Sequence, residues 1–272
     1  MLTVEGEPYS YGNNNVLFPK KVNVFFFKRV IDVIKRNIIF FLTLSVITAG
    51  ISYIITSFIS KPLLGEIDLA DIFQKGNSFK ELLPVFSKMV FDNVVLLIPY
   101  SYFFTILISA LPNMYLSKPA SFFHFNKQDI VRMLILYVYL VIIFHLEIAG
   151  LLMCIIPGII IIIWCSFIPL VIVIENNYKP VKRSFYLLSG RQLEIFFIYL
   201  VILFLQIIFS IPYIVLYILK GEEAFLALQK NALFTIIFES MNIFIIYGAV
   251  VLLFQIYMMA RIANNEIEVV QE

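Results

Sequence analysis

Three ionisable side chains interrupt long apolar runs of this sequence, and they are its first candidates for chemistry. His145 and Glu147 lie in one run and Glu239 lies in another. A charged group inside a membrane is costly, and such groups commonly bind or conduct protons and cations. Two positions apart on a helix, His145 and Glu147 point to different sides, so Glu239 can meet only one of them. The three residues predict an intramembrane polar site. The alternatives are an internal bridge that fixes helix packing and a carboxylate at the outer water boundary.

A second group of charges follows the apolar run that ends at residue 174. It consists of Glu175, Lys182, Arg183 and Arg191. Guanidinium groups bind phosphate and carboxylate groups through paired hydrogen bonds, and basic segments beside a membrane attract anionic lipid. These residues predict a site for lipid phosphate or a protein partner on the inner face. The alternative is topological, because basic residues also keep a loop in the cytoplasm.

No enzyme signature accompanies these charges. The sequence has no His-Glu-x-x-His motif, no Gly-rich phosphate loop and no Gly-x-Ser-x-Gly motif. Cys154 and Cys165 lack His or carboxylate residues at metal-binding spacing, so we expect them to pack as small apolar residues. We therefore expect a non-enzymatic protein with no cofactor and no metal. The net charge of +2 is too small to indicate binding to nucleic acid.

Membrane-crossing helices have to position these side chains, because the composition excludes an ordinary soluble domain. The 272 residues are 61% hydrophobic and 14% charged, whereas a soluble domain is roughly half apolar and a quarter charged. A helix that crosses the hydrocarbon core needs about 20 apolar residues. The sequence predicts an all-α polytopic membrane protein with six spans: residues 37–60, 93–117, 130–155, 159–174, 195–219 and 232–260.

The positions of Lys and Arg predict the orientation of these spans. With the amino terminus in the cytoplasm, only six of the 20 Lys and Arg residues lie outside, namely Lys61, Lys75, Lys80, Lys88, Lys220 and Lys230. Because cytoplasmic loops carry the excess of positive charge, we expect both termini in the cytoplasm. The outer connections are then a long polar loop at residues 61–88, a tight turn at Pro157–Gly158 and a short loop at residues 221–230.

Three basic segments, residues 19–36, 118–132 and 179–191, each precede a pair of spans. Each has a Lys/Pro pair near its start, and apolar residues at helical spacing predict amphipathic helices on the cytoplasmic membrane surface. They divide a single membrane domain at residues 19–262 into three proposed repeats, 19–117, 118–178 and 179–262. Residues 1–18 are expected to be a flexible tail and residues 263–272 a second tail.

One span carries a family-level pattern, in which Pro-Gly precedes an apolar helix and an acidic residue precedes a helix closed by Gly. The positions are Pro157, Gly158, Pro169, Leu170, Glu175, Ser184, Leu187 and Gly190. This pattern resembles the membrane domain of bacterial glycerophosphoryl diester phosphodiesterases and related stand-alone six-helix inner-membrane proteins. The family often has Ala where Val181 stands. No segment can hold the soluble phosphodiesterase domain, so the resemblance implies neither its activity nor its metal site.

Two classes of function fit these features best, ahead of a third, an intramembrane lipid enzyme with no familiar motif. The first is a scaffold or accessory factor in envelope or lipid homeostasis of the inner (plasma) membrane, in contact with anionic lipid, a protein partner or a second copy. The alternative is a small-solute or ion transporter or channel that uses His145, Glu147 and Glu239.

Overall fold

A computed structural model describes residues 24–60, 79–118, 127–153, 155–175, 179–229, 231–264 and 266. Its regular structure within these ranges is entirely helical, which confirms the all-α prediction. The helices are α1 Val24–Arg36, α2 Ile38–Ile55, α5 Phe79–Tyr115, α6 Lys127–Met153, α7 Ile155–Cys165, α8 Ile168–Glu175, α9 Pro180–Leu188, α10 Gln192–Gln229 and α11 Ala232–Ala263. A π-helical turn, η1 Thr56–Ser60, continues α2.

Six helical stretches in the described residues are long and apolar enough to cross a membrane. They are Ile38–Ile59, Asn93–Tyr115, Lys127–Gly150, Ile156–Glu175, Gln192–Pro212 and Ala232–Ala263. Each coincides with one span expected from the sequence. The chain is a multi-pass integral membrane protein.

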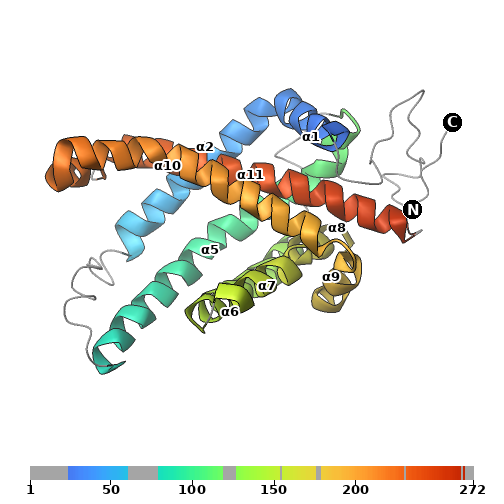
Figure 1. The fold of residues 1–272 in the computed structure, drawn as a ribbon, viewed down its shortest axis with the longest axis horizontal. Coiled ribbons are helices and arrows are strands. Elements are labelled where there is room, and N and C mark those ends of the chain that lie inside the picture. Colours follow the sequence, from blue (N-terminus) through green and yellow to red (C-terminus); the bar gives the residue numbers. More distant parts are fainter. Residues whose placement is uncertain are drawn as a thin grey trace.

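Helix α11 lies at the centre of the helix bundle, in contact with α1, α2, α5, α9 and α10 (Figure 1). In its most apolar stretch 72% of the residues are buried, against 11% in the corresponding stretches of α6 and α10. The outer surfaces of α6 and α10 are therefore left for lipid, while α11 carries the core. Fully buried side chains such as Tyr247, Phe254 and Tyr257 fill that core.

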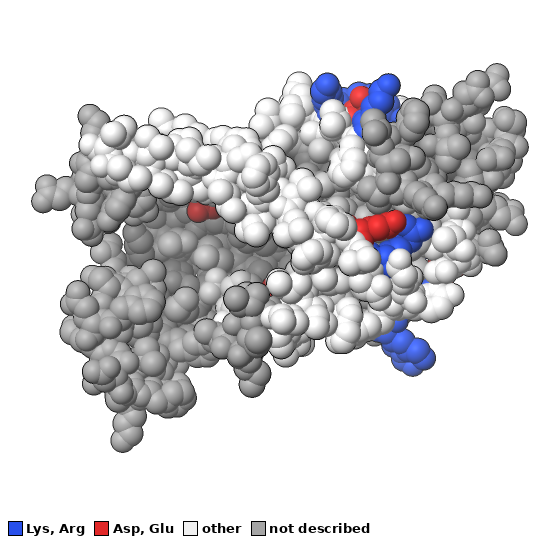
Figure 2. All heavy atoms as spheres, viewed as in Figure 1, with Lys and Arg blue, Asp and Glu red and all other residues white. Residues whose placement is uncertain are grey.

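The short helices α1 and α9 lie toward one end of the molecule. The starts of α2 and α10 and the ends of α5 and α11 lie at the same end, on the right of Figure 1. On the visible surface, the described Lys and Arg side chains gather toward this end as well (Figure 2). We call it the α1–α9 face.

Helix α1 is amphipathic. Phe26, Val30 and Val33 are buried against the bundle, whereas Lys28 and Lys35 are exposed. A single non-helical residue, Asn37, separates α1 from α2. The amide of its side chain donates to the carbonyl of Val33 at 2.9 Å, and its backbone N–H donates to the same carbonyl at 3.2 Å. Asn37 therefore closes the last turn of α1 before α2 begins.

The predicted turn at Pro157–Gly158 is wrong. Helix α6 ends at Met153 and α7 begins at Ile155, so both residues lie in the first turn of α7. Proline is accepted there because the first N–H groups of a helix have no intrahelical acceptor. The close approach of the two helices depends on glycine, since a Cβ on Gly150 of α6 would lie 2.9 Å from the Cα of Gly158.

The fourth span is two helices rather than one. Helix α7 ends at Cys165, and α8 starts at Ile168 after a turn at Ser166 and Phe167. Pro169 explains the break, because it has no N–H to donate to the carbonyl four residues earlier and its ring clashes with that carbonyl.

Two of the loops that the sequence places outside are shorter than predicted. Residues 79–88, expected in the first loop, form the start of α5, and residues 221–229 continue α10. Residues 61–78 of the first loop lie outside the described residues. Helices α1 and α9 lie in two of the three segments expected to form surface helices, and their place at a membrane surface stays a prediction. In the second, residues 119–126 are outside the described residues and Lys127–Arg132 begin α6, so the threefold repeat stays a prediction.

Candidate functional site

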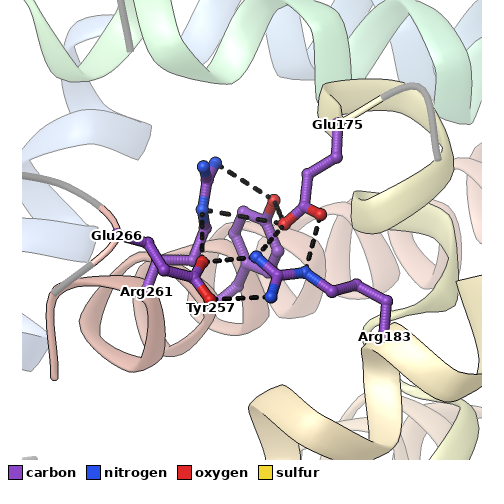
Figure 3. Close-up of polar contacts among 5 residues, drawn as sticks. All are labelled: Glu175, Arg183, Tyr257, Arg261 and Glu266. Atoms are coloured by element: carbon purple, nitrogen blue, oxygen red, sulfur yellow. Dashed lines mark hydrogen bonds and ion pairs between the residues drawn. The ribbon is translucent and has the colours of Figure 1, made fainter. Parts of the chain in front are cut away.

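Glu175 and Arg183 form the nucleus of a charged site at the α1–α9 face (Figure 3). Glu175 is the last residue of α8, and Arg183 lies in the first turn of α9. Arg183 Nε donates to Glu175 Oε2 at 2.8 Å, and Nη2 donates to Oε1 at 3.1 Å. Two parallel bonds of this kind fix the relative orientation of both side chains, so the contact sets the angle between α8 and α9.

Three further residues from the C-terminal part of the chain complete the site. Arg183 also donates to both carboxylate oxygens of Glu266, with Nη1 2.7 Å from Oε1. Tyr257 donates its hydroxyl to Glu175 Oε1 at 2.7 Å. Arg261 Nε lies 3.4 Å from Glu266 Oε2 and 3.6 Å from Glu175 Oε1. We call these five residues the Glu175 network.

The network neutralises its own charges. Two guanidinium groups face two carboxylates, and each charged side chain is at most 22% exposed. Hydrogen bonds from Arg183 hold the pKa of the Glu266 carboxyl below its ordinary value. The hydrogen bonds to Glu266 and then to Glu175 raise the pKa of Arg183, against the opposing effect of burial. The network therefore holds α8, α9 and the end of α11 together through hydrogen bonds and ion pairs.

Local chemistry places α9 where Arg183 can reach this network. Pro180 occupies the first turn of α9, and Gly190 follows the helix with φ of +81°, a left-handed conformation that favours glycine. Between them, buried Ser184 donates its hydroxyl to the carbonyl of Trp164 at 2.9 Å. That carbonyl lies in the last turn of α7, where intrahelical donors run out.

Arg191 and Lys182, the other predicted residues of the inner-face site, lie outside the network. Arg191 Nη1 donates to Glu194 at 2.9 Å, and Nη2 reaches the carbonyl of Met259 at 3.5 Å. Arg191 thus links the start of α10 to α11. Lys182 is exposed on α9.

The structure does not bring His145, Glu147 and Glu239 together. Among the described residues, no hydrogen bond or ion pair joins Glu239 to either of the others. Glu147 interacts electrostatically with Cys165 and Tyr199.

Glu239 lies elsewhere, close to Tyr100 on α5 and exposed on α11. His145 Nδ1 is 2.6 Å from the carbonyl oxygen of Val141, and Nε2 is buried without a hydrogen-bond partner in the described part of the chain. The three residues therefore occupy two separate neighbourhoods.

Three members of the network were not predicted as site residues. Tyr257 stands in an uncharged, mostly apolar run, where a tyrosine is indistinguishable from any other core residue. Arg261 is one of the 14 Lys and Arg residues expected on the cytoplasmic side, and Glu266 lies in the segment expected to be a tail. The one available signal was the basic residue in the last turn of α11 followed by an acidic residue five positions later.

Comparisons of the chain with protein-family models, with curated proteins and with solved structures found no match. The resemblance carried by Pro157 to Gly190 therefore stays a prediction.

Proposed function

We propose that this membrane protein is a non-enzymatic scaffold or accessory factor in envelope or lipid homeostasis, which contacts anionic lipid from the cytoplasmic side of the inner membrane. One observation carries the proposal. At the α1–α9 face, the arginines of the Glu175 network are paired internally, whereas Lys28, Lys35 and Lys182 are exposed. Compact ammonium groups on surface helices suit the phosphates of an anionic leaflet.

The orientation supports the same proposal. Cytoplasmic segments carry the excess of Lys and Arg, and the described Lys and Arg side chains gather at the α1–α9 face (Figure 2). This end would therefore face the cytoplasm, where anionic headgroups attract basic residues by about 1 kcal/mol each.

Lipid analysis of the purified protein tests the proposal. The full chain is extracted in mild detergent, and the ratio of anionic to zwitterionic phospholipid that stays bound is compared with the ratio in the membrane extract. We expect enrichment of anionic lipid in the wild type and its loss in the triple variant Lys28→Gln, Lys35→Gln, Lys182→Gln. The matched control is Lys88→Gln with Lys220→Gln, on the segments expected outside. An unchanged lipid ratio in the triple variant would exclude the proposal.

A transporter is the second candidate, and His145 is the observation that favours it. Its buried Nε2 has no hydrogen-bond partner in the described part of the chain, and Glu147 follows two residues later. An imidazole nitrogen of this kind can accept a proton. Proteoliposomes with a pH-sensitive dye inside would report proton flux under an imposed gradient. Transport predicts flux in the wild type and none in Glu147→Gln, and the absence of flux in both would remove this candidate.

A further inference from the structure

An apolar groove with a volume of about 510 Å³ lies between α1, α2, α10 and α11. Among the described residues that line it, the only polar side chains are Ser45 on α2 and Ser240 on α11. Both hydroxyls donate to a carbonyl of their own helix, of Phe41 at 2.8 Å and of Ile236 at 2.6 Å. The described lining therefore offers no free hydrogen-bond donor to a polar solute, and its apolar side chains suit a hydrocarbon occupant.

The length of the groove suits one leaflet of a bilayer. Along α11 its lining runs from Ser240 to Leu252, which corresponds to about 18 Å at the helical rise of 1.5 Å per residue. Half of the hydrocarbon core of a bilayer is about 15 Å thick. An acyl chain inserted from the α1 side would thus be covered along most of its length.

A missing side chain contributes to keeping the groove open. Gly248 of α11 lines it, and a Cβ at this position would lie 3.8 Å from Cδ1 of Ile34 on α1. Ile34 is therefore within van der Waals reach of position 248. Because residue 248 is glycine, no side chain extends from it into the adjacent groove.

The position of α1 is fixed independently of the groove. Gln255 accepts a 2.8 Å hydrogen bond from the Tyr115 hydroxyl, and its amide lies 3.5 Å from the carbonyl of Phe26. Arg29 donates to the carbonyl of Tyr115 at 3.0 Å. The groove is thus preformed, which lowers the entropic cost of binding.

Two cations stand beside the part of α1 that lines the groove. Phe27 and Ile34 line it, and the next residues, Lys28 and Lys35, are exposed. Lys28 and Lys35 are seven positions apart and so lie on one side of the helix. Arg36 is directed elsewhere, since it donates to the Ser117 hydroxyl after α5. An apolar groove with adjacent ammonium groups matches a molecule with a hydrocarbon tail and an anionic head.

We infer that the groove holds one acyl chain of an anionic phospholipid from the leaflet on the α1 side, with the lipid phosphate at Lys28 and Lys35. This inference rests on the proposed function and adds a defined, one-lipid site to it. The lipid then acts as part of the contact between α1 and the spans α2, α10 and α11.

Native mass spectrometry of the delipidated full chain with palmitoyl-oleoyl phosphatidylglycerol tests the inference. Phosphatidylcholine with the same chains is the headgroup control. We expect one phosphatidylglycerol bound in preference to phosphatidylcholine. Gly248→Leu fills the groove and weakens binding of both lipids about tenfold or more, since losing contact with two methylenes already has that effect. Gly50→Leu is the matched control, because a Cβ at Gly50 meets nothing within 4 Å. It should bind like the wild type.

A second variant keeps the test valid if Gly248→Leu does not fold. Val46 lines the groove on α2, so Val46→Phe narrows it. The control is Ile39→Phe on the same helix, because the Ile39 side chain is 77% exposed and is not among the described lining residues. Circular dichroism verifies the helix content of every variant. Wild-type affinity in folded Gly248→Leu or Val46→Phe would overturn the inference, as would a stable dimer that excludes lipid from the groove.

Substitution of the lysines separates the inference from the proposed function. Lys28→Gln with Lys35→Gln should remove the preference for phosphatidylglycerol and leave binding of phosphatidylcholine unchanged. If the double lysine variant keeps the preference for phosphatidylglycerol while Gly248→Leu abolishes lipid binding, the headgroup contact and the proposed function are wrong and the acyl-chain site is supported. If the double lysine variant loses the preference while the groove variants bind lipid like the wild type, the proposed function is supported and the acyl-chain site is wrong.

Discussion

The hydroxyl of Tyr257 lies 2.7 Å from Oε1 of Glu175 and donates a hydrogen bond to it, which joins the C-terminal part of the buried helix α11 to the end of α8. Tyr257 is fully buried, and its ring packs edge-on against Phe167 in the turn before α8 at 5.8 Å. One side chain thus holds both ends of α8. This contact ties the charged surface network to the hydrophobic core.

Removing this hydroxyl should destabilise the protein. In Tyr257→Phe the ring packing is kept but Glu175 loses a donor in a nearly buried position, at a cost of about 1–2 kcal/mol. The measurement is unfolding in detergent followed by circular dichroism. Tyr139→Phe is the control, because the Tyr139 hydroxyl makes no hydrogen bond in the described part of the chain. Equal stability of the two variants would contradict the assigned role.

Acidification should weaken the ion pair between Glu266 and Arg183. The pKa of Glu266 in the folded protein lies below its ordinary value of 4.5 because Arg183 donates hydrogen bonds to the ionised form. The pair therefore contributes stability above about pH 4.5, and this contribution is lost as the pH falls through the lower, folded-state pKa. Glu266→Gln should lower stability at pH 7 and flatten the decline below pH 4.5. Asp32→Asn, a carboxylate without an ion pair in the described residues, should keep the wild-type profile.

The network shows which part of a site can be predicted from sequence. Glu175 and Arg183 could be singled out, because charges beside an apolar run are conspicuous. Their partners could not, since Tyr257 and Glu266 reach them only through the packing of α11 against α9. Hydropathy separates spans from loops, but it carries no information on which loop residue folds back onto which helix end.

The spans were predictable for a simpler reason, namely that hydrocarbon excludes charge along about 20 residues. Their ends were predicted less well. Pro-Gly is typical of a turn, but proline is equally compatible with the first turn of a helix. At Pro157–Gly158 the choice depends on the contact of Gly158 with Gly150, which belongs to another helix.

That contact leads to a prediction about the α6–α7 hairpin. In Gly150→Ala the new Cβ would lie 2.9 Å from Cα and 3.0 Å from the backbone nitrogen of Gly158. Backbone atoms cannot rotate away, so the two helices must separate, at a cost of about 1–3 kcal/mol. Gly50→Ala in α2, where a Cβ meets nothing within 4 Å, should be neutral or stabilising by up to about 1 kcal/mol. Thermal unfolding of both variants tests this prediction. If Gly150→Ala is as stable as Gly50→Ala, the α6–α7 hairpin is packed less tightly than the structure indicates.

The attachment of α1 to the bundle can be tested through Gln255 and Tyr115, both buried and joined by a 2.8 Å hydrogen bond. In Gln255→Leu the Tyr115 hydroxyl loses this acceptor in an apolar site, which should cost about 1–3 kcal/mol. In the double variant with Tyr115→Phe both polar groups are gone, so part of that stability should return, and a double-mutant cycle measures the coupling. Loss of the Gln255 contacts should also detach α1 from the bundle. Limited proteolysis should then cleave the chain faster between α1 and α2. Additive effects of the two substitutions would mean that the bond does not couple α11 to α5, and that α1 is held by its apolar face alone.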